Sequence, residues 1–192
     1  MNKKAIFAVV TLGLSLISGQ ALNEVIFEDK DFSKDGWSDF RDISNGAGWE
    51  VRSREMGGLV QGVVQEVTIG GSGGVYLSSG DGNHASVFRL DGTIRAIRSR
   101  DGQRTVVGEA EVSGEADVRI GFDGAFFIYE YRSGDKWTRL GKSDIIGLVS
   151  YRGGISTNNR ASDMSNYRVV KLDSLLGVRF GYTDTPKIPG TP

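Results

Sequence analysis

Asp-Gly pairs recur at residues 81–82, 91–92 and 101–102 of this 192-residue chain. Asp-Gly favours the positive φ angles of the tight turns that join antiparallel strands. The segments beside these pairs have the composition of short strands: residues 85–90, 93–99 and 104–112. Turn signals about 8–12 residues apart are typical of a β-sandwich or barrel, and no segment repeats apolar residues at helical spacing. The sequence therefore predicts an all-β protein.

A fourth Asp-Gly pair, Asp123-Gly124, lies inside the stretch Asp117–Leu140, which predicts a hairpin followed by a third strand. A two-residue turn at this pair predicts three facing pairs: Phe122 with Ala125, Ile120 with Phe127, and Val118 with Tyr129. Residues that face each other across a hairpin share one face of the sheet. The apolar face formed in this way must be buried against a second layer.

Residues 1–21 have the pattern of a secretory signal peptide. Lys3 and Lys4 precede the apolar run Ala5–Ile17, which is too short for a membrane span, and small residues follow it. No cysteine follows the run, which argues against a lipoprotein anchor. We expect a protein that is secreted or periplasmic after cleavage, with no membrane span.

Removing residues 1–21 from 192 leaves 171, enough for one domain with a core of its own. It also removes two lysines and no acid, so the formal net charge goes from −1 to −3. Such a charge gives no electrostatic reason to bind nucleic acid. We expect a β-sandwich domain over residues 22–172. Residues 173–192 are expected to form an edge strand and a flexible tail that holds all three prolines.

Three segments resemble the concanavalin A-like jelly-roll superfamily, in particular its laminin G-like and related bacterial secreted domains. They are Gly48–Gln61 with its W-x-V and G-x-L pattern, Gly124–Gly141 with a tryptophan after a polar turn, and Gly153–Val170. Met164-Ser165-Asn166 departs from the F-D-N pattern of the last segment. The resemblance implies a two-sheet antiparallel jelly-roll sandwich. Members of this superfamily include sugar-binding modules, glycosidases, lyases and adhesion domains, so the fold does not decide the function.

Catalytic motifs are sparse. His84 is the single histidine, no serine lies in a Gly-x-Ser-x-Gly elbow, and the absence of cysteine disfavours zinc. Glu109, Glu111 and Glu115 loosely resemble the E-x-D-x-x-x-E motif of some glycosidases in the superfamily. The turn-like Ser113-Gly114 would send Glu115 into the next strand, which favours a solvated face over a catalytic pair.

A calcium site is suggested by the expected meeting of the first and last strands. Glu28, Asp29 and Asp31 would then approach Asp163 and Asn166, and calcium prefers such hard oxygen ligands. The predicted metal ligands are Asp29, Asp31 and Asp163. The alternative is an ordinary acidic surface loop.

Aromatic and basic residues give the remaining functional signal. Aromatic rings next to polar or glycine-rich turns can stack on sugars, and these are Trp37, Tyr76, Tyr131, Trp137 and Tyr151. Five arginines lie close together in the sequence, and guanidinium groups pair with carboxylate or sulfate: Arg89, Arg95, Arg98, Arg100 and Arg104. The predicted carbohydrate-binding residues are Trp137, Tyr131, Tyr76, Arg98 and His84. For each of them, an ordinary core or solvent-facing position is the alternative.

The sequence thus favours a secreted, non-catalytic β-sandwich that binds carbohydrate, and the arginines suit an acidic polysaccharide. One alternative is a glycoside hydrolase or polysaccharide lyase of the same fold. Another is a cell-surface adhesion or assembly domain that recognises protein.

Overall fold

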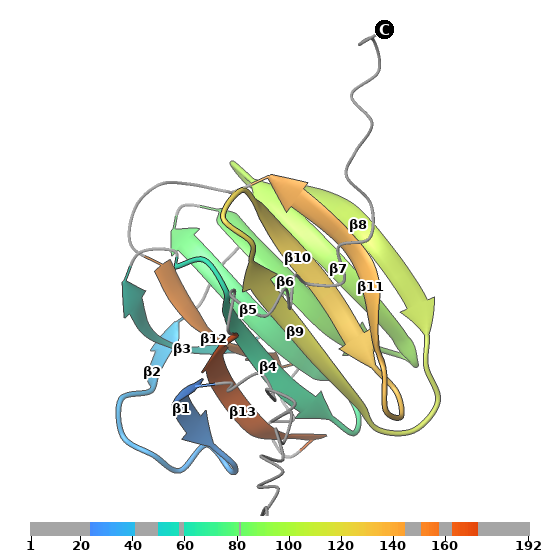
Figure 1. The fold of residues 1–192 in the computed structure, drawn as a ribbon, viewed down its shortest axis with the longest axis horizontal. Coiled ribbons are helices and arrows are strands. Elements are labelled where there is room, and N and C mark those ends of the chain that lie inside the picture. The colour runs from blue at the N-terminus through green and yellow to red at the C-terminus, as the bar shows by residue number, and fades with distance from the viewer. Residues whose placement is uncertain are drawn as a thin grey trace, which may run out of the picture.

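A computed structural model describes residues 24–40, 50–57, 60–80, 82–144, 151–157 and 163–172. These residues form two antiparallel β-sheets (Figure 1). The predicted signal peptide and the predicted C-terminal edge strand and tail lie outside the described residues. Across the described ranges, no helix has the length and apolar character needed to cross a bilayer.

The first sheet, sheet A, contains six strands. Their order across the sheet is β1 (Glu24–Asp29), β13 (Met164–Lys171), β4 (Val63–Ile69), β9 (Ala116–Phe122), β10 (Phe126–Arg132) and β11 (Trp137–Asp144). The first and last strands therefore pair with each other, as the sequence predicts for a jelly roll.

The second sheet, sheet B, contains seven strands. Their order is β2 (Ser38–Phe40), β3 (Glu50–Gly57), β12 (Tyr151–Thr157), β5 (Gly73–Gly80), β6 (Asn83–Leu90), β7 (Thr93–Arg100) and β8 (Gln103–Glu111). Strands β5 to β8 form a meander of successive hairpins.

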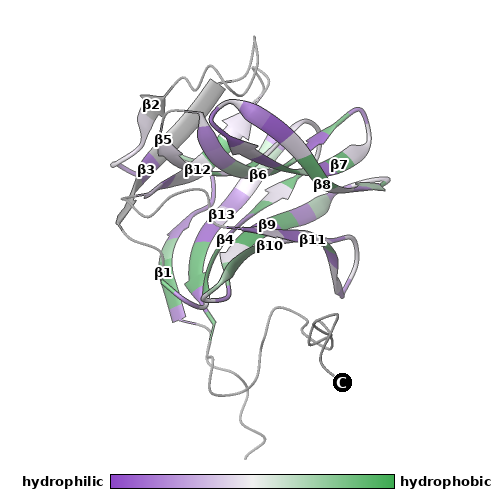
Figure 2. Ribbon diagram, turned by 90° about the horizontal axis from the view of Figure 1, so that it is seen from above, coloured by the Kyte–Doolittle hydropathy of each residue, from purple (hydrophilic) through white to green (hydrophobic). Residues whose placement is uncertain are grey.

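The two sheets pack face to face with the apolar core between them (Figure 2). Large side chains from both sheets are fully buried there: Ile69, Ile94, Ile120, Phe127, Tyr129 and Ile155. This arrangement confirms the predicted two-sheet antiparallel sandwich. Because side chains alternate along a strand, each sheet has a second face turned away from the core, and we call it the outer face.

Two of the predicted Asp-Gly turns of the meander are confirmed, and Asp81 of the third lies outside the described residues. Asp91 and Gly92 have φ angles of 51° and 81°, and Asp101 and Gly102 have φ angles of 51° and 77°. Positive φ at both central residues is the signature of the type I′ turn, whose twist matches that of the flanking strands.

The predicted register of the central hairpin is wrong by two residues. Phe122 pairs with Phe127 and Ile120 pairs with Tyr129, so the turn centres on Gly124-Ala125. The cause is the Asp123 carboxylate, which accepts hydrogen bonds from the backbone N–H groups of Ala125 and Phe126 at 2.9 and 2.7 Å. A shift of two residues leaves every side chain on its predicted face, so the apolar surface lies in the core as expected.

Arg89 of β6 ties together the two connections in which the chain changes sheets between β4 and β9. Its guanidinium is buried and donates to the backbone carbonyls of Gly70, Val112 and Gly114. Gly70 follows β4, and Val112 and Gly114 lie between β8 and β9. A single side chain therefore fixes both crossovers relative to β6.

On one side of the sandwich, the edge strands β8 and β11 lie very close together. A Cβ atom on Gly108 would come within 2.1 Å of the Leu140 carbonyl oxygen, and one on Gly141 would come within 2.6 Å of the Val107 side chain. Both strands carry a bulge near this contact. The absence of a side chain at both glycines allows this approach.

Replacing Phe127 with alanine should lower the free energy of unfolding by about 3–5 kcal/mol, because a fully buried ring leaves a cavity. Urea unfolding measures the change. Val106→Ala is the control, since that side chain is 54% exposed, and it should stay within about 0.5 kcal/mol. Equal effects of the two changes would contradict the assigned core.

Replacing Arg89 with methionine should lower the free energy of unfolding by about 3 kcal/mol or more, because buried carbonyls lose charged donors. Arg95→Met, on the next strand but with a half-exposed side chain, is the matched control. A stability of Arg89→Met equal to that of the control would contradict the role given to Arg89.

Candidate functional site

A hollow of about 180 Å³ lies on the outer face of sheet B. Along β6, Ala85 and Val87 point into the core, so His84, Ser86 and Phe88 point outward. The hollow is lined by outward side chains of four strands of sheet B, namely β6, β7, β8 and, beyond β5, β12: His84, Ser86, Phe88, Leu90, Arg95, Ile97, Arg104 and Ser156. It combines apolar surface with hydroxyl, imidazole and guanidinium groups.

The His84 end of the hollow is tightly packed. Tyr76 lies beside His84 on the neighbouring strand β5, and their rings stack with centroids 5.3 Å apart. Both side chains are almost completely buried, although they are outward residues of their strands. A side chain of the opposite sheet also holds the Tyr76 backbone in place, because the Gln65 amide donates a hydrogen bond to the Tyr76 carbonyl oxygen at 2.9 Å. The predicted site residues His84 and Tyr76 are thus brought together.

Ser86 lies in the middle of the hollow with a buried hydroxyl group that has no hydrogen-bond partner among the described residues. Leaving a buried hydroxyl unsatisfied costs about 1–3 kcal/mol, and proteins rarely tolerate it. Ser99 on the next strand shows the usual arrangement, since its buried hydroxyl donates to the Gly82 carbonyl oxygen at 2.7 Å. The Ser86 hydroxyl therefore has hydrogen-bonding capacity that the described residues do not use, at a residue that lines the hollow.

The glutamates of the E-x-E motif lie on β8, the strand next to β7. Glu109 forms an ion pair with Arg95 at 3.1 Å, and Glu111 accepts a hydrogen bond from Thr93 at 2.9 Å. Glu115 lies beyond the end of β8, in the connection to β9. Each strand glutamate is thus engaged by its cross-strand neighbour, as on a solvated sheet face.

The other predicted carbohydrate-binding residues lie elsewhere. Tyr131 packs against the core from the inner face of sheet A. Arg98 also points inward, because its neighbour Ile97 lines the outer hollow, and it lies near the Tyr129 hydroxyl. Burial raises the pKa of Tyr129, although Arg98 and a hydrogen bond with Ser143 oppose the shift. Neither Tyr131 nor Arg98 lines the hollow.

Trp137 lies on the outer face of sheet A, half-buried and outside the core clusters. The guanidinium carbons of Arg119 and Arg132 lie 3.8 and 4.9 Å from its ring centroid. Arg119 forms a buried ion pair with Glu130 at 2.6 Å. The indole therefore stacks on arginine in this structure, on the sheet opposite to His84 and Tyr76.

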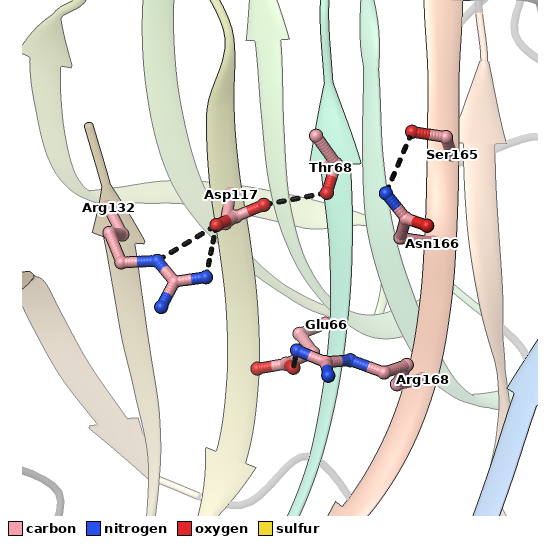
Figure 3. Close-up of polar contacts among 7 residues, drawn as sticks. All are labelled: Glu66, Thr68, Asp117, Arg132, Ser165, Asn166 and Arg168. Carbon is pink, nitrogen blue, oxygen red and sulfur yellow. Dashed lines mark hydrogen bonds and ion pairs between the residues drawn. The ribbon is translucent and has the colours of Figure 1, made fainter. Parts of the chain in front are cut away.

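Further ion pairs extend along the same face of sheet A, from β10 to β13 (Figure 3). Asp117 accepts hydrogen bonds from Arg132 and, at 2.7 Å, from the Thr68 hydroxyl. Glu66 pairs with Arg168 on the next strand. Because these charged side chains are paired with one another, they are less available to a ligand than the polar groups in the hollow of sheet B.

The predicted metal ligand Asp29 organises the loop after β1. Its buried carboxylate accepts hydrogen bonds from the Trp37 indole at 2.8 Å, the Lys34 backbone N–H at 3.0 Å and the Ser33 N–H at 3.3 Å. Burial would raise the pKa of Asp29, but the Trp37 indole and the backbone N–H groups more than offset it and hold the pKa below its usual value. Trp37 itself packs edge-on against Tyr167 at 5.1 Å.

Asp31 and Asp163 have separate partners. Asp31 is exposed and accepts hydrogen bonds from Ser33, whereas Asp163 accepts one from the Ser72 N–H at 3.2 Å. Within the part of the chain that the structure describes, no three acidic or histidine side chains form a group that could hold a metal. The calcium site stays a prediction from the sequence.

Comparisons with known proteins extend the description of the fold. The sequence matches no protein-family model, and the search of curated proteins found no match. A xylan β-1,4-xylosidase from Bacillus halodurans is similar in structure at 6% identity and a TM-score of 0.50, covering 70% of this chain and 31% of that chain.

Two further solved structures are similar to the chain. A GH43 protein from Bacillus licheniformis has 15% identity and a TM-score of 0.47, covering 71% of this chain and 32% of that chain. The carbohydrate-binding module CBM66 from Bacillus subtilis has 11% identity and a TM-score of 0.46, covering 71% of this chain and 93% of that module. The chain thus spans about a third of the two larger proteins. At these identities a likeness concerns the fold alone, and the fold that the strand pairing shows is a two-sheet antiparallel β-sandwich.

Sequence reasoning found the His84 end of the hollow and missed its middle. Ser86, Phe88 and Ile97 were assigned to strands but to no site. The alternation of β6 was a usable signal, because Ala85 and Val87 in the core leave Ser86 and Phe88 outside. Ser156 comes from a strand far along the chain, and no local pattern brings it to this face.

Replacing Asp29 with asparagine should lower the free energy of unfolding by about 1–3 kcal/mol at pH 7, because an N–H₂ group would meet N–H donors. A carboxyl with a lowered folded pKa stabilises the protein above its unfolded pKa, about 4, and this stability is lost as the pH falls through the folded value. The difference in melting temperature between wild type and D29N should therefore shrink below about pH 4. A difference that is constant from pH 7 to pH 3 would contradict this role.

Proposed function

We propose that the protein is an exported, non-catalytic β-sandwich that binds carbohydrate in the hollow of sheet B. The observation that carries the proposal is the buried Ser86 hydroxyl without a partner among the described residues. A fold that leaves such a group unsatisfied gives up stability, and a hydroxyl-rich ligand would satisfy it.

The lining of the hollow supports a sugar as that ligand. Phe88 and Ile97 provide apolar surface for the C–H groups of a sugar ring. His84, Ser86 and Ser156 provide polar groups for its hydroxyls. Binding sites for drug-sized molecules measure about 300–1,000 Å³, so a hollow of about 180 Å³ suits one sugar unit of a longer chain. The sequence suggests an acidic polysaccharide, and Arg95 and Arg104 in the lining agree with that class.

We favour binding over hydrolysis because of the chemistry of the lining. Hydrolysis of a glycosidic bond uses two carboxyl groups, roughly 5–10 Å apart, on either side of the bond. The described residues that line the hollow offer hydroxyl, imidazole and guanidinium groups instead of carboxyl groups. Release of reducing sugar from a bound polysaccharide would favour the hydrolase instead.

Replacing Ser86 with alanine should weaken carbohydrate binding about five- to tenfold, because one polar contact with the sugar is lost. The same change should leave the melting temperature equal or higher, since it removes an unsatisfied buried hydroxyl. A glycan array identifies the ligand, and titration calorimetry and thermal unfolding measure the two effects.

Ser99→Ala is the matched control, because its buried hydroxyl already has a partner. We expect it to lower the free energy of unfolding by about 1 kcal/mol and to leave binding nearly unchanged. A lower stability of S86A with unchanged binding would contradict the proposal, because Ser86 would then be an ordinary structural residue.

A further inference from the structure

We propose that the bound saccharide is anionic and that Arg104 holds its carboxylate or sulfate group at the His84 end of the hollow. The inference rests on the proposed carbohydrate binding and specifies the chemical class of the sugar. It follows from a difference in ion pairing between the two arginines that line the hollow, Arg104 and Arg95.

Arg104 reaches the hollow from β8. It pairs with Ser99 of β7, and Ser99 pairs in turn with His84 of β6, so the three residues form one row across the outer face. Among the described residues, Arg104 has no ion-pair partner, and its side chain is exposed. Its charge is therefore open to a ligand in the hollow.

Arg95 also lines the hollow, but its charge is already used. Its Nε lies 3.1 Å from the Glu109 carboxylate, which offsets the positive charge of Arg95. A ligand anion at Arg95 would have to compete with this carboxylate and would be repelled by it. Arg95 therefore contributes less to anion binding than Arg104, and replacing Glu109 with a neutral residue makes it available.

The rest of the lining is compatible with an anion. Guanidinium groups donate two parallel hydrogen bonds to carboxylate or sulfate, and Ser86 can donate a further bond to the same sugar. The described lining residues include no aspartate or glutamate that would repel an anionic group. A neutral sugar would leave the Arg104 charge without a partner in the complex.

Titration calorimetry with three oligosaccharide probes tests the inference. Oligogalacturonate carries carboxylates, its fully methyl-esterified form is a neutral match, and a sulfated galactan oligosaccharide carries sulfate. We expect one of the two anionic probes to bind at least tenfold more tightly than the neutral one. The better anionic probe identifies the acid group.

Three variants assign the anion to its arginine. Arg104→Gln should weaken binding of the anionic probe at least tenfold and reduce its dependence on salt. Glu109→Gln should strengthen binding severalfold, because it frees Arg95, and a misfolded variant could not produce this gain. Arg100→Gln makes the same charge change on the opposite face of the sheet and should have no effect.

The outcomes separate this inference from the proposed function. If the neutral probe binds as tightly as the anionic ones and Ser86→Ala weakens it, the carbohydrate site stands and the anionic ligand is wrong. Equal binding by Arg104→Gln and wild type would also overturn the role of Arg104. If none of the probes binds and a glycan array gives no ligand, the proposed function itself fails.

Discussion

The arrangement of the sandwich depends on one buried cation. Arg89 sits on an inner position of β6 and donates hydrogen bonds to carbonyl oxygens in both the β4–β5 and the β8–β9 connections. Burying a guanidinium costs free energy unless it is hydrogen-bonded. The Arg89 Nε has no partner among the described residues, but the two terminal nitrogens bind both crossovers and so favour one geometry of approach to β6. Because side chains alternate along β6, the inward position of Arg89 places His84, Ser86 and Phe88 on the outer face.

Both outer faces of the sandwich include buried polar atoms without a partner among the described residues, such as the Arg168 Nε on sheet A and the Ser86 Oγ on sheet B. On the outer face of sheet A, Arg119 pairs with Glu130 and also stacks on Trp137. On the outer face of sheet B, the Ser86 hydroxyl and the Arg104 guanidinium lie in one hollow without partners among the described residues. On sheet B this capacity lies in a concave, partly apolar hollow, which is the usual setting of a ligand-binding site.

Local structure could be predicted from the sequence wherever it depends on residues that are adjacent in the chain. The Asp91-Gly92 turn could be predicted because its backbone angles follow from two residue types. The central hairpin was placed two residues out of register, because the Asp123 side chain captures two backbone N–H groups and moves the turn. Tyr131 and Trp137 were grouped as one site, yet they lie on opposite faces of sheet A. Which side chains meet on one face of the sandwich depends on the strand order and on bulges, and local sequence patterns do not contain this information.

Ligand binding on the outer face of sheet B can be located by mapping backbone amide chemical shifts of the labelled protein during titration with its best oligosaccharide. We expect the largest changes in β6, β7 and the start of β8, around Ser86 and Arg104. Changes confined to β9, β10 and β11, around Trp137, would contradict it.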